Sequence, residues 1–128
     1  MGFFNTVSGS SQENQSLSKV GWRQLIHLDQ LNELVGESKN KPVFIFKHST
    51  RCGVSRMVLK QFESEYDLDD AAIPYFLDLL THRGLSDAVA VRFGVRHQSP
   101  QLIVVKDGKA VFHDSHESID AGRLEQFI

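Results

Sequence analysis

The chain has one cysteine, Cys52, and it stands where a short apolar run gives way to a helical pattern. The apolar run covers residues 43–46, and the helical spacing begins near Gly53. Backbone N–H groups at the start of a helix, together with the helix dipole, favour a thiolate over a thiol. Three neighbours can add positive charge: Lys47, His48 and Arg51. This setting favours a reactive nucleophile over a small, inert core residue, which is the alternative for a free cysteine.

A single cysteine restricts the redox chemistry that the chain can do. It excludes an internal disulfide, so Cys52 does not stabilise the fold by a covalent cross-link. A thiolate attacks a disulfide sulfur and forms a mixed disulfide, which another thiol then resolves. In a Cys-x-x-Cys protein that second thiol stands three residues later, where this chain has Ser55. We therefore expect Cys52 to depend on an external thiol, with Ser55 either hydrogen-bonded to the thiolate or serving as a spacer in the first helical turn.

Strand and helix patterns alternate along the chain and predict an α/β fold. Such alternation implies parallel strands with helices on both faces of a central sheet, and Asp107-Gly108 predicts a hairpin that adds an antiparallel edge. The fold class is therefore a mixed β-sheet flanked by helices. We expect strands at residues 23–27, 43–46, 73–80, 101–106 and 109–113. Helices are expected after Asp29, from Gly53, around residues 85–93 and after Ser118.

Local signals refine these helices. Asp29 and Ser118 are expected to act as N-caps, and Gly94 should end the helix before it. Each helix should turn an apolar stripe toward the core. The expected stripes are Leu31, Leu34 and Val35 in the first helix; Val54, Met57, Val58, Phe62 and Tyr66 in the second; Leu85, Ala88, Val89 and Phe93 in the third; and Leu124, Phe127 and Ile128 in the last.

The second half of the chain resembles a thioredoxin. Residues 92–96 (RFGVR) are followed by Pro100 and by residues 102–109 (LIVVKDGK), and Pro100 falls where that family carries its cis-proline, opposite the active-site cysteine. More closely, residues 46–55 (FKHSTRCGVS), 97–101 (HQSPQ) and 113–116 (HDSH) resemble the monothiol bacilliredoxins, the bacillithiol-system YtxJ family. The resemblance runs from about Trp22 to the C-terminus. The chain departs from thioredoxins in having Phe46 where they tend to have a buried acid.

This resemblance implies a thioredoxin-like fold and a monothiol exchange reaction. Cys52 would remove a low-molecular-weight thiol such as bacillithiol from S-thiolated proteins, and a second small thiol would then free Cys52. The partners would be S-thiolated proteins and the small thiol itself, which is a co-substrate, with no tightly bound cofactor. Cys52 and Ser55 are the candidate catalytic residues. The candidate substrate-binding residues are His48, Thr50, His97, Ser99 and Pro100, where a cis Pro100 would expose the Ser99 backbone to an extended substrate strand.

Two other functions remain open at this point. The segment Cys52-Gly53-Val54-Ser55 also resembles the CGFS motif of monothiol glutaredoxins, which hold a [2Fe–2S] cluster between two protomers. The Gly-Gly segment of that family is absent, and residues 114–117 (DSHE) stand there instead. The chain could also be a thioredoxin-fold binding module without redox activity. His113 and His116 are too few for a closed metal site, so no metal is predicted.

Composition indicates an ordinary globular chain of 128 residues with a formal charge of -2. That charge gives no reason to expect nucleic acid or an anionic membrane as partner, and no apolar run approaches the ~20 residues of a membrane-spanning helix. The first 19 residues end in a polar, Ser-rich stretch and are expected to be a flexible segment, with a single domain over residues 20–128. A lone thiol without a secretory signal predicts the cytoplasm.

Overall fold

The computed structural model describes residues 20–128 and contains a five-stranded sheet in the order β1-β3-β2-β4-β5. β1 (Arg23–Gln24), β3 (Ile73–Asp78) and β2 (Val43–His48) are parallel to one another. β4 (Gln101–Lys106) runs antiparallel to β2, and β5 (Lys109–Ser115) antiparallel to β4. The predicted mixed α/β sheet is confirmed. The predicted flexible segment 1–19 lies outside the described residues.

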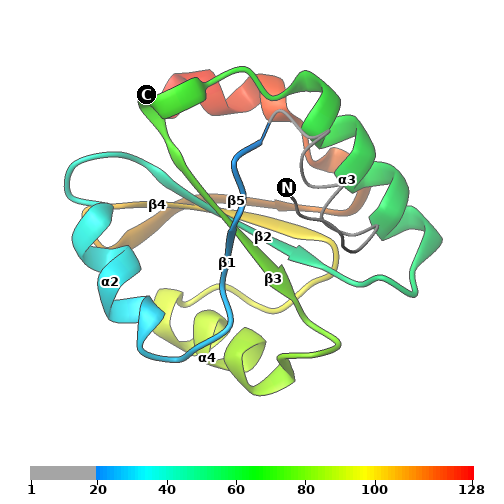
Figure 1. Ribbon diagram of the computed structural model, residues 1–128, viewed down its shortest axis with the longest axis horizontal. Coiled ribbons are helices and arrows are strands. Elements are labelled where there is room, and N and C mark those ends of the chain that lie inside the picture. Colours follow the sequence, from blue (N-terminus) through cyan, green and yellow to red (C-terminus); the bar gives the residue numbers. More distant parts are fainter. Residues whose placement is uncertain (1–19) are drawn as a thin grey trace, which may run out of the picture.

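Helices cover both faces of this sheet (Figure 1). α2 (Gln30–Glu37) and α4 (Arg83–Phe93) lie on one face. α3 (Gly53–Glu65) lies on the other, beside the C-terminal 3₁₀ segments η2 (His116–Ser118) and η3 (Ala121–Phe127). A further 3₁₀ turn, η1 (Asp69–Ala71), leads into β3. Among the described residues, no helix combines the length and the apolar character needed to cross a bilayer.

The central strand β2 is buried along its whole length and contributes side chains to two separate hydrophobic cores. Val43 and Ile45 belong to the core under α2 and α4, whereas Phe44 and Phe46 pack into the core under α3. Successive strand residues point to opposite faces of a sheet. The two residues that end the strand continue this alternation, so Lys47 faces the α4 side and His48 faces the α3 side. The alternation therefore decides on which face of the sheet each of these two polar side chains finds its partners.

The turn signals of the sequence are confirmed. Asp107 and Gly108 have φ of 52° and 76° and form the tight β4–β5 turn, which requires positive φ at both positions. Gly94 ends α4 with φ of 63° in the left-handed region. Strand bounds differ more: β1 has two residues instead of five, and β3 ends at Asp78 instead of residue 80.

Of the two predicted N-caps, Asp29 holds the N-cap position of α2 without a capping bond, and Ser118 is wrong. Asp29 has helical dihedrals and its side chain makes no capping bond; instead the Gln30 side chain accepts from the backbone N–H groups of Ile26 and His27. Ser118 lies inside η2, and the cap of the last segment is Asp120, whose carboxylate accepts from the Gly122 N–H at 2.8 Å. The cap of the last segment therefore lies two residues after the predicted one.

The apolar stripes are also partly wrong. In α3, Val54 and Met57 are 37% and 58% exposed, and the buried stripe is Ser55, Val58 and Phe62. The helix thus turns a serine toward the sheet, where Ser55 has polar partners. At the C-terminus Leu124 is buried as predicted, but Ile128 is 56% exposed.

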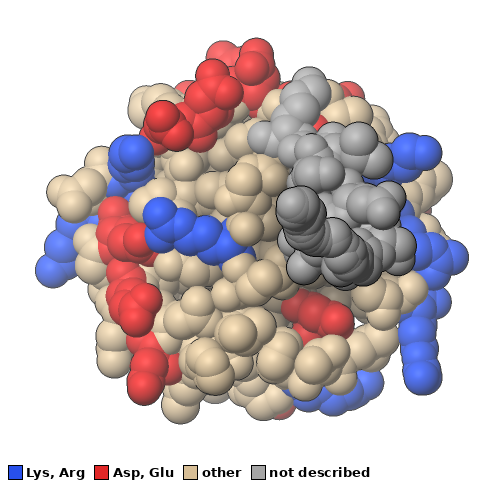
Figure 2. Space-filling view, viewed as in Figure 1, with Lys and Arg blue, Asp and Glu red and all other residues tan. Residues whose placement is uncertain are grey.

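Charged side chains of both signs share the face seen in Figure 2. Acidic groups gather along its upper and left margins, and basic groups lie toward both sides. The described surface in this view therefore has no field of a single sign.

Candidate functional site

The loops that carry Cys52 and Pro100 leave the sheet at the same end. In the antiparallel pair β2–β4, Lys47 lies opposite Gln101. Cys52 follows the end of β2 by four residues, and Pro100 immediately precedes β4. The Ser99–Pro100 peptide bond is cis, and Pro100 is buried. Strand register therefore brings the cysteine loop and the proline loop to one edge of the molecule.

Cys52 is the N-cap residue of α3. Its backbone is extended, with φ of −98° and ψ of 121°, and its carbonyl accepts the first helical bond from the Arg56 N–H at 3.1 Å. Its own N–H donates to the Ser49 carbonyl at 3.2 Å, which closes the loop that precedes it. The thiol is half-buried, and no acidic side chain lies in the first turn of α3. The sulfur therefore stands at the end of α3 where the first backbone N–H groups have no partner within the helix.

Ser55 lies directly beneath this loop and is fully buried. Its hydroxyl oxygen is 2.8 Å from Nδ1 of His48 and 3.1 Å from the backbone nitrogen of Ser49. Burial lowers the pKa of His48, with Asp78 opposing the shift and Arg56 adding to it. The Ser55 hydroxyl accepts the Ser49 N–H and shares a second hydrogen bond with the imidazole of His48. Ser55 thus joins the end of β2 to the first turn of α3.

Arg56 is a residue of this site that the sequence analysis did not single out. Its guanidinium donates to the Thr50 carbonyl at 2.9 Å. The contact holds a permanent positive charge against the cysteine loop. Its place in the first turn of the helix, four residues after Cys52, was the signal that could have found it. The side chains of Thr50 and Arg51 are exposed.

Lys47 does not lie on the α3 side of the sheet, where α3 and its cysteine begin. It is completely buried and points toward α4, where Nζ is 3.1 Å from the Ser86 carbonyl and 3.2 Å from Nδ1 of His97. Burial lowers the pKa of Lys47 to about 8, and the charge of Asp87 opposes that shift. The positive charge of Lys47, expected near Cys52, therefore lies against His97 of the proline loop.

The proline loop is held by a buried side chain of β4 and by a backbone hydrogen bond from η2. Gln101 is 1% exposed, and its Nε2 donates to the Arg96 carbonyl at 2.8 Å. The Pro100 carbonyl accepts from the His116 N–H at 3.0 Å. Two buried oxygen atoms, Ser99 Oγ and Gln101 Oε1, have no hydrogen-bond partner among residues 20–128. The loop is thus fixed at its base, while His97 remains exposed.

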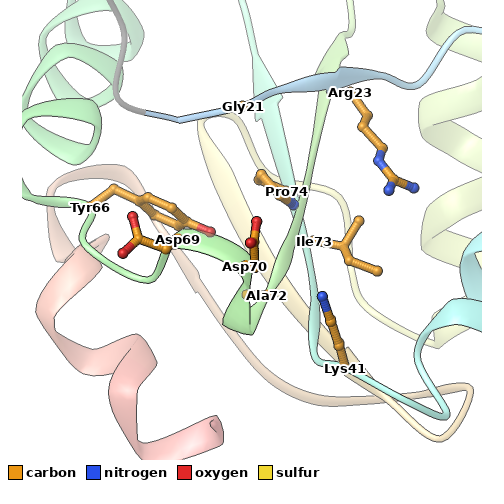
Figure 3. Close-up of a pocket in the computed structure, with 9 residues that line it drawn as sticks. All are labelled: Gly21, Arg23, Lys41, Tyr66, Asp69, Asp70, Ala72, Ile73 and Pro74. Atoms are coloured by element: carbon orange, nitrogen blue, oxygen red, sulfur yellow. The ribbon is translucent and has the colours of Figure 1, made fainter.

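A separate pocket of about 600 Å³ lies at the opposite end of the sheet, near the start of β3 (Figure 3). Arg23 and Lys41 lie on one side of it and Asp69 and Asp70 on the other, and the Tyr66 ring reaches in from the end of α3. Because β2 and β3 are parallel, this pocket is at their amino ends. Cys52 follows the carboxyl end of β2, so the thiol lies outside this pocket.

A family model described as monothiol bacilliredoxin BrxC matches residues 23–124. Among solved structures, a candidate oxidoreductase with a thioredoxin fold is 32% identical, with a TM-score of 0.70 over 82% of this chain and 91% of that chain. Thioredoxin from Malassezia sympodialis (Mala s 13) is 21% identical, with a TM-score of 0.64 over 85% and 87%. Thioredoxin from Fasciola hepatica is 20% identical, with a TM-score of 0.62 over 81% and 93%. The two thioredoxins show the shared fold.

Proposed function

Because the chain belongs to the monothiol bacilliredoxin family, we propose that it removes a small thiol from S-thiolated proteins by exchange at Cys52. Membership of this family and the thioredoxin fold indicate a thiol redox role. The observation that supports the proposal best is the position of Cys52. It is a half-buried N-cap residue at the end of the sheet that also carries Pro100, with Ser55 three residues later.

The proposed cycle has two exchanges. The Cys52 thiolate attacks the small-thiol sulfur of a protein mixed disulfide, and the electron pair of the broken S–S bond leaves on the protein sulfur, which takes a proton from water. Cys52 now carries the small thiol as a mixed disulfide. A second small-thiol thiolate attacks the sulfur of this adduct, forms the symmetric small disulfide and releases the Cys52 thiolate. The protein sulfur is reduced to a thiol, and the second small thiol is oxidised as it joins the first in the symmetric disulfide.

The remaining candidate residues receive roles from their positions. Ser55 and His48 hold the loop that presents Cys52, because their buried hydrogen bonds link β2, the loop and α3. Thr50 and His97 are exposed on the two loops at this end, where a substrate would approach. Ser99 and Pro100 would offer backbone to an extended substrate segment. We propose bacillithiol as the small thiol, from the family's name, and the cytoplasm as the compartment in which the thiol stays reduced.

Transfer of the adduct tests this proposal directly. The full chain is incubated with a bacillithiolated and a glutathionylated model protein, and intact-mass spectrometry follows which adduct moves to Cys52. We expect the bacillithiol mass on the wild type and no adduct on Cys52→Ala. Transfer from glutathionylated protein alone would reject bacillithiol as the small thiol. Transfer from neither protein would reject the exchange reaction.

A further inference from the structure

The buried contact between Lys47 and His97 joins strand β2 to the loop before Pro100. The exchange chemistry proposed above makes no use of it. Lys47 has 0% exposure, and its Nζ reaches the Ser86 carbonyl at 3.1 Å and His97 Nδ1 at 3.2 Å. A buried ammonium group is costly unless its protons are bonded. The Ser86 carbonyl and His97 Nδ1 are the two acceptors that offset the cost of burying the Lys47 ammonium group.

This contact decides which nitrogen of His97 carries the proton. A charged lysine has three N–H donors and no acceptor, so Nδ1 of His97 must accept. Ser86 Oγ lies 3.3 Å from the same nitrogen and can donate to it as well. Burial first, then the charges of Lys47 and Arg83, lower the pKa of His97, with Asp87 opposing them. A neutral imidazole that accepts at Nδ1 carries its hydrogen on Nε2.

We propose that Lys47 is a positioning residue that fixes His97 with its hydrogen on Nε2, so that the exposed ring donates a hydrogen bond to a carboxylate of the small thiol. His97 is exposed although Nδ1 is occupied, so the rest of the ring is available to a ligand. The buried charge of Lys47 behind the ring strengthens its attraction for an anion. The inference rests on the proposed function and specifies the substrate class: a small thiol that carries a carboxylate.

The preference for a carboxylate should depend on pH in a defined way. Lys47 and His97 face each other, and the charged groups of α4 that act on them are Asp87 and Arg83. The pKa of Lys47 is about 8, so its charge is lost as the pH rises above that value. A neutral Lys47 no longer forces Nδ1 to accept and no longer attracts an anion. The preference should therefore be present at pH 7 and decline toward pH 9.

Two disulfides that differ only in charge provide the probe. The symmetric disulfide of 3-mercaptopropionate carries carboxylates, and that of 3-mercaptopropionamide is its neutral isostere. Each is mixed with the reduced full chain, and mass spectrometry follows the rate at which Cys52 becomes thiolated. The ratio of the two rates at one pH cancels the ionisation of Cys52. We expect the wild type to favour the carboxylate by about fivefold at pH 7, the size of one charge-assisted hydrogen bond at a partly exposed site.

Matched variants separate Lys47 from the general charge of the surface. Lys47→Met and His97→Leu should bring the ratio close to one. Lys39→Met removes one exposed positive charge from the loop before β2 and should leave the ratio at its wild-type value. A wild-type ratio of one, or an unchanged ratio in Lys47→Met, would overturn the inference.

A spectroscopic measurement tests the same contact without any reaction. The ¹⁵N shifts of the His97 ring in the wild type should show a hydrogen on Nε2 at pH 7, and a mixture of tautomers should appear toward pH 9. A hydrogen on Nδ1 at pH 7 would contradict the proposed role of Lys47, even if Lys47→Met fails to fold. If thiolated proteins transfer no adduct while the ratio and the shifts behave as expected, the proposed function fails and the inferred carboxylate preference stands.

Discussion

The Ser55 hydroxyl lies 2.8 Å from Nδ1 of His48, and this buried contact ties the first turn of α3 to the last residue of β2. The same oxygen accepts from the Ser49 N–H, at the start of the loop that leads to Cys52. In a Cys-x-x-Cys protein this position would hold the resolving thiol. Here it holds the loop, because the hydroxyl is hydrogen-bonded to both the Ser49 N–H and the imidazole of His48.

Removing this hydroxyl should destabilise the protein. Ser55→Ala leaves the Ser49 N–H and His48 Nδ1 without their partner at a buried site, which costs about 1–3 kcal/mol. The free energy of unfolding in urea, followed by circular dichroism, measures the loss. Ser64→Ala is the matched control, because its hydroxyl also bonds within α3, to the Gln61 carbonyl, but is exposed. Equal stability of the two variants would contradict the structural role of Ser55.

Restoring a thiol at this position should change the course of the exchange. In Ser55→Cys the second thiol lies three residues after Cys52 in the first turn of α3. It should attack the Cys52 mixed disulfide, form an internal disulfide and release the small thiol. Mass spectrometry after reaction with a thiolated protein should then show a loss of two hydrogens, where the wild type shows the small-thiol adduct. A persistent adduct on the variant would contradict this expectation.

Acidification should destabilise the wild type through His48. Burial lowers the pKa of His48 in the folded state below its ordinary value of 6.5, so the unfolded chain binds the extra proton first. Stability is therefore full above about pH 6.5 and falls as the pH drops through that value toward the lower folded pKa. We expect the free energy of unfolding to decrease from pH 7.5 to pH 5.5 in the wild type.

The contribution of His48 is isolated by comparing variants. His97, whose pKa is also lowered by burial, adds to the effect in the same direction, so only the difference between variants is diagnostic. His48→Gln should lose less stability on acidification than the wild type does. His27→Gln, at an exposed position, should behave like the wild type. The same pH dependence in all three proteins would show that His48 does not contribute.

Raising the pH should stabilise the folded protein through Lys47. Burial lowers the pKa of Lys47 from 10.5 to about 8, so between these values the unfolded chain binds more protons than the folded one. Stability should therefore rise with pH across this window, by a few kcal/mol at most. Lys47→Met should lack this rise. Urea titrations at pH 7.5, 9 and 10 measure it, and parallel curves for both proteins would contradict the burial of a charged Lys47.

Local signals were sufficient for much of the fold. The apolar run 43–46 predicted a central strand, Asp107-Gly108 predicted the hairpin and Gly94 the end of α4, and the structure confirms all three. Each depends on backbone sterics or on periodicity over a few residues, and both can be recognised in the chain itself. The position of Cys52 at the start of a helix was likewise predictable, because a change from strand to helix spacing marks that junction.

The tertiary structure decided the polar contacts of the site. Lys47 and His97 are 50 residues apart in the chain, and only the β2–β4 pairing and the packing of α4 bring them together. The alternation of a strand separates Lys47 from His48, but which helix covers each face is settled by the folded core. Ser55 illustrates the same limit. Apolar spacing favoured Val54 and Met57 for the buried stripe, but α3 buries Ser55 with Val58 and Phe62, and the hydrogen-bond partners of Ser55 lie on a loop and a strand outside the helix.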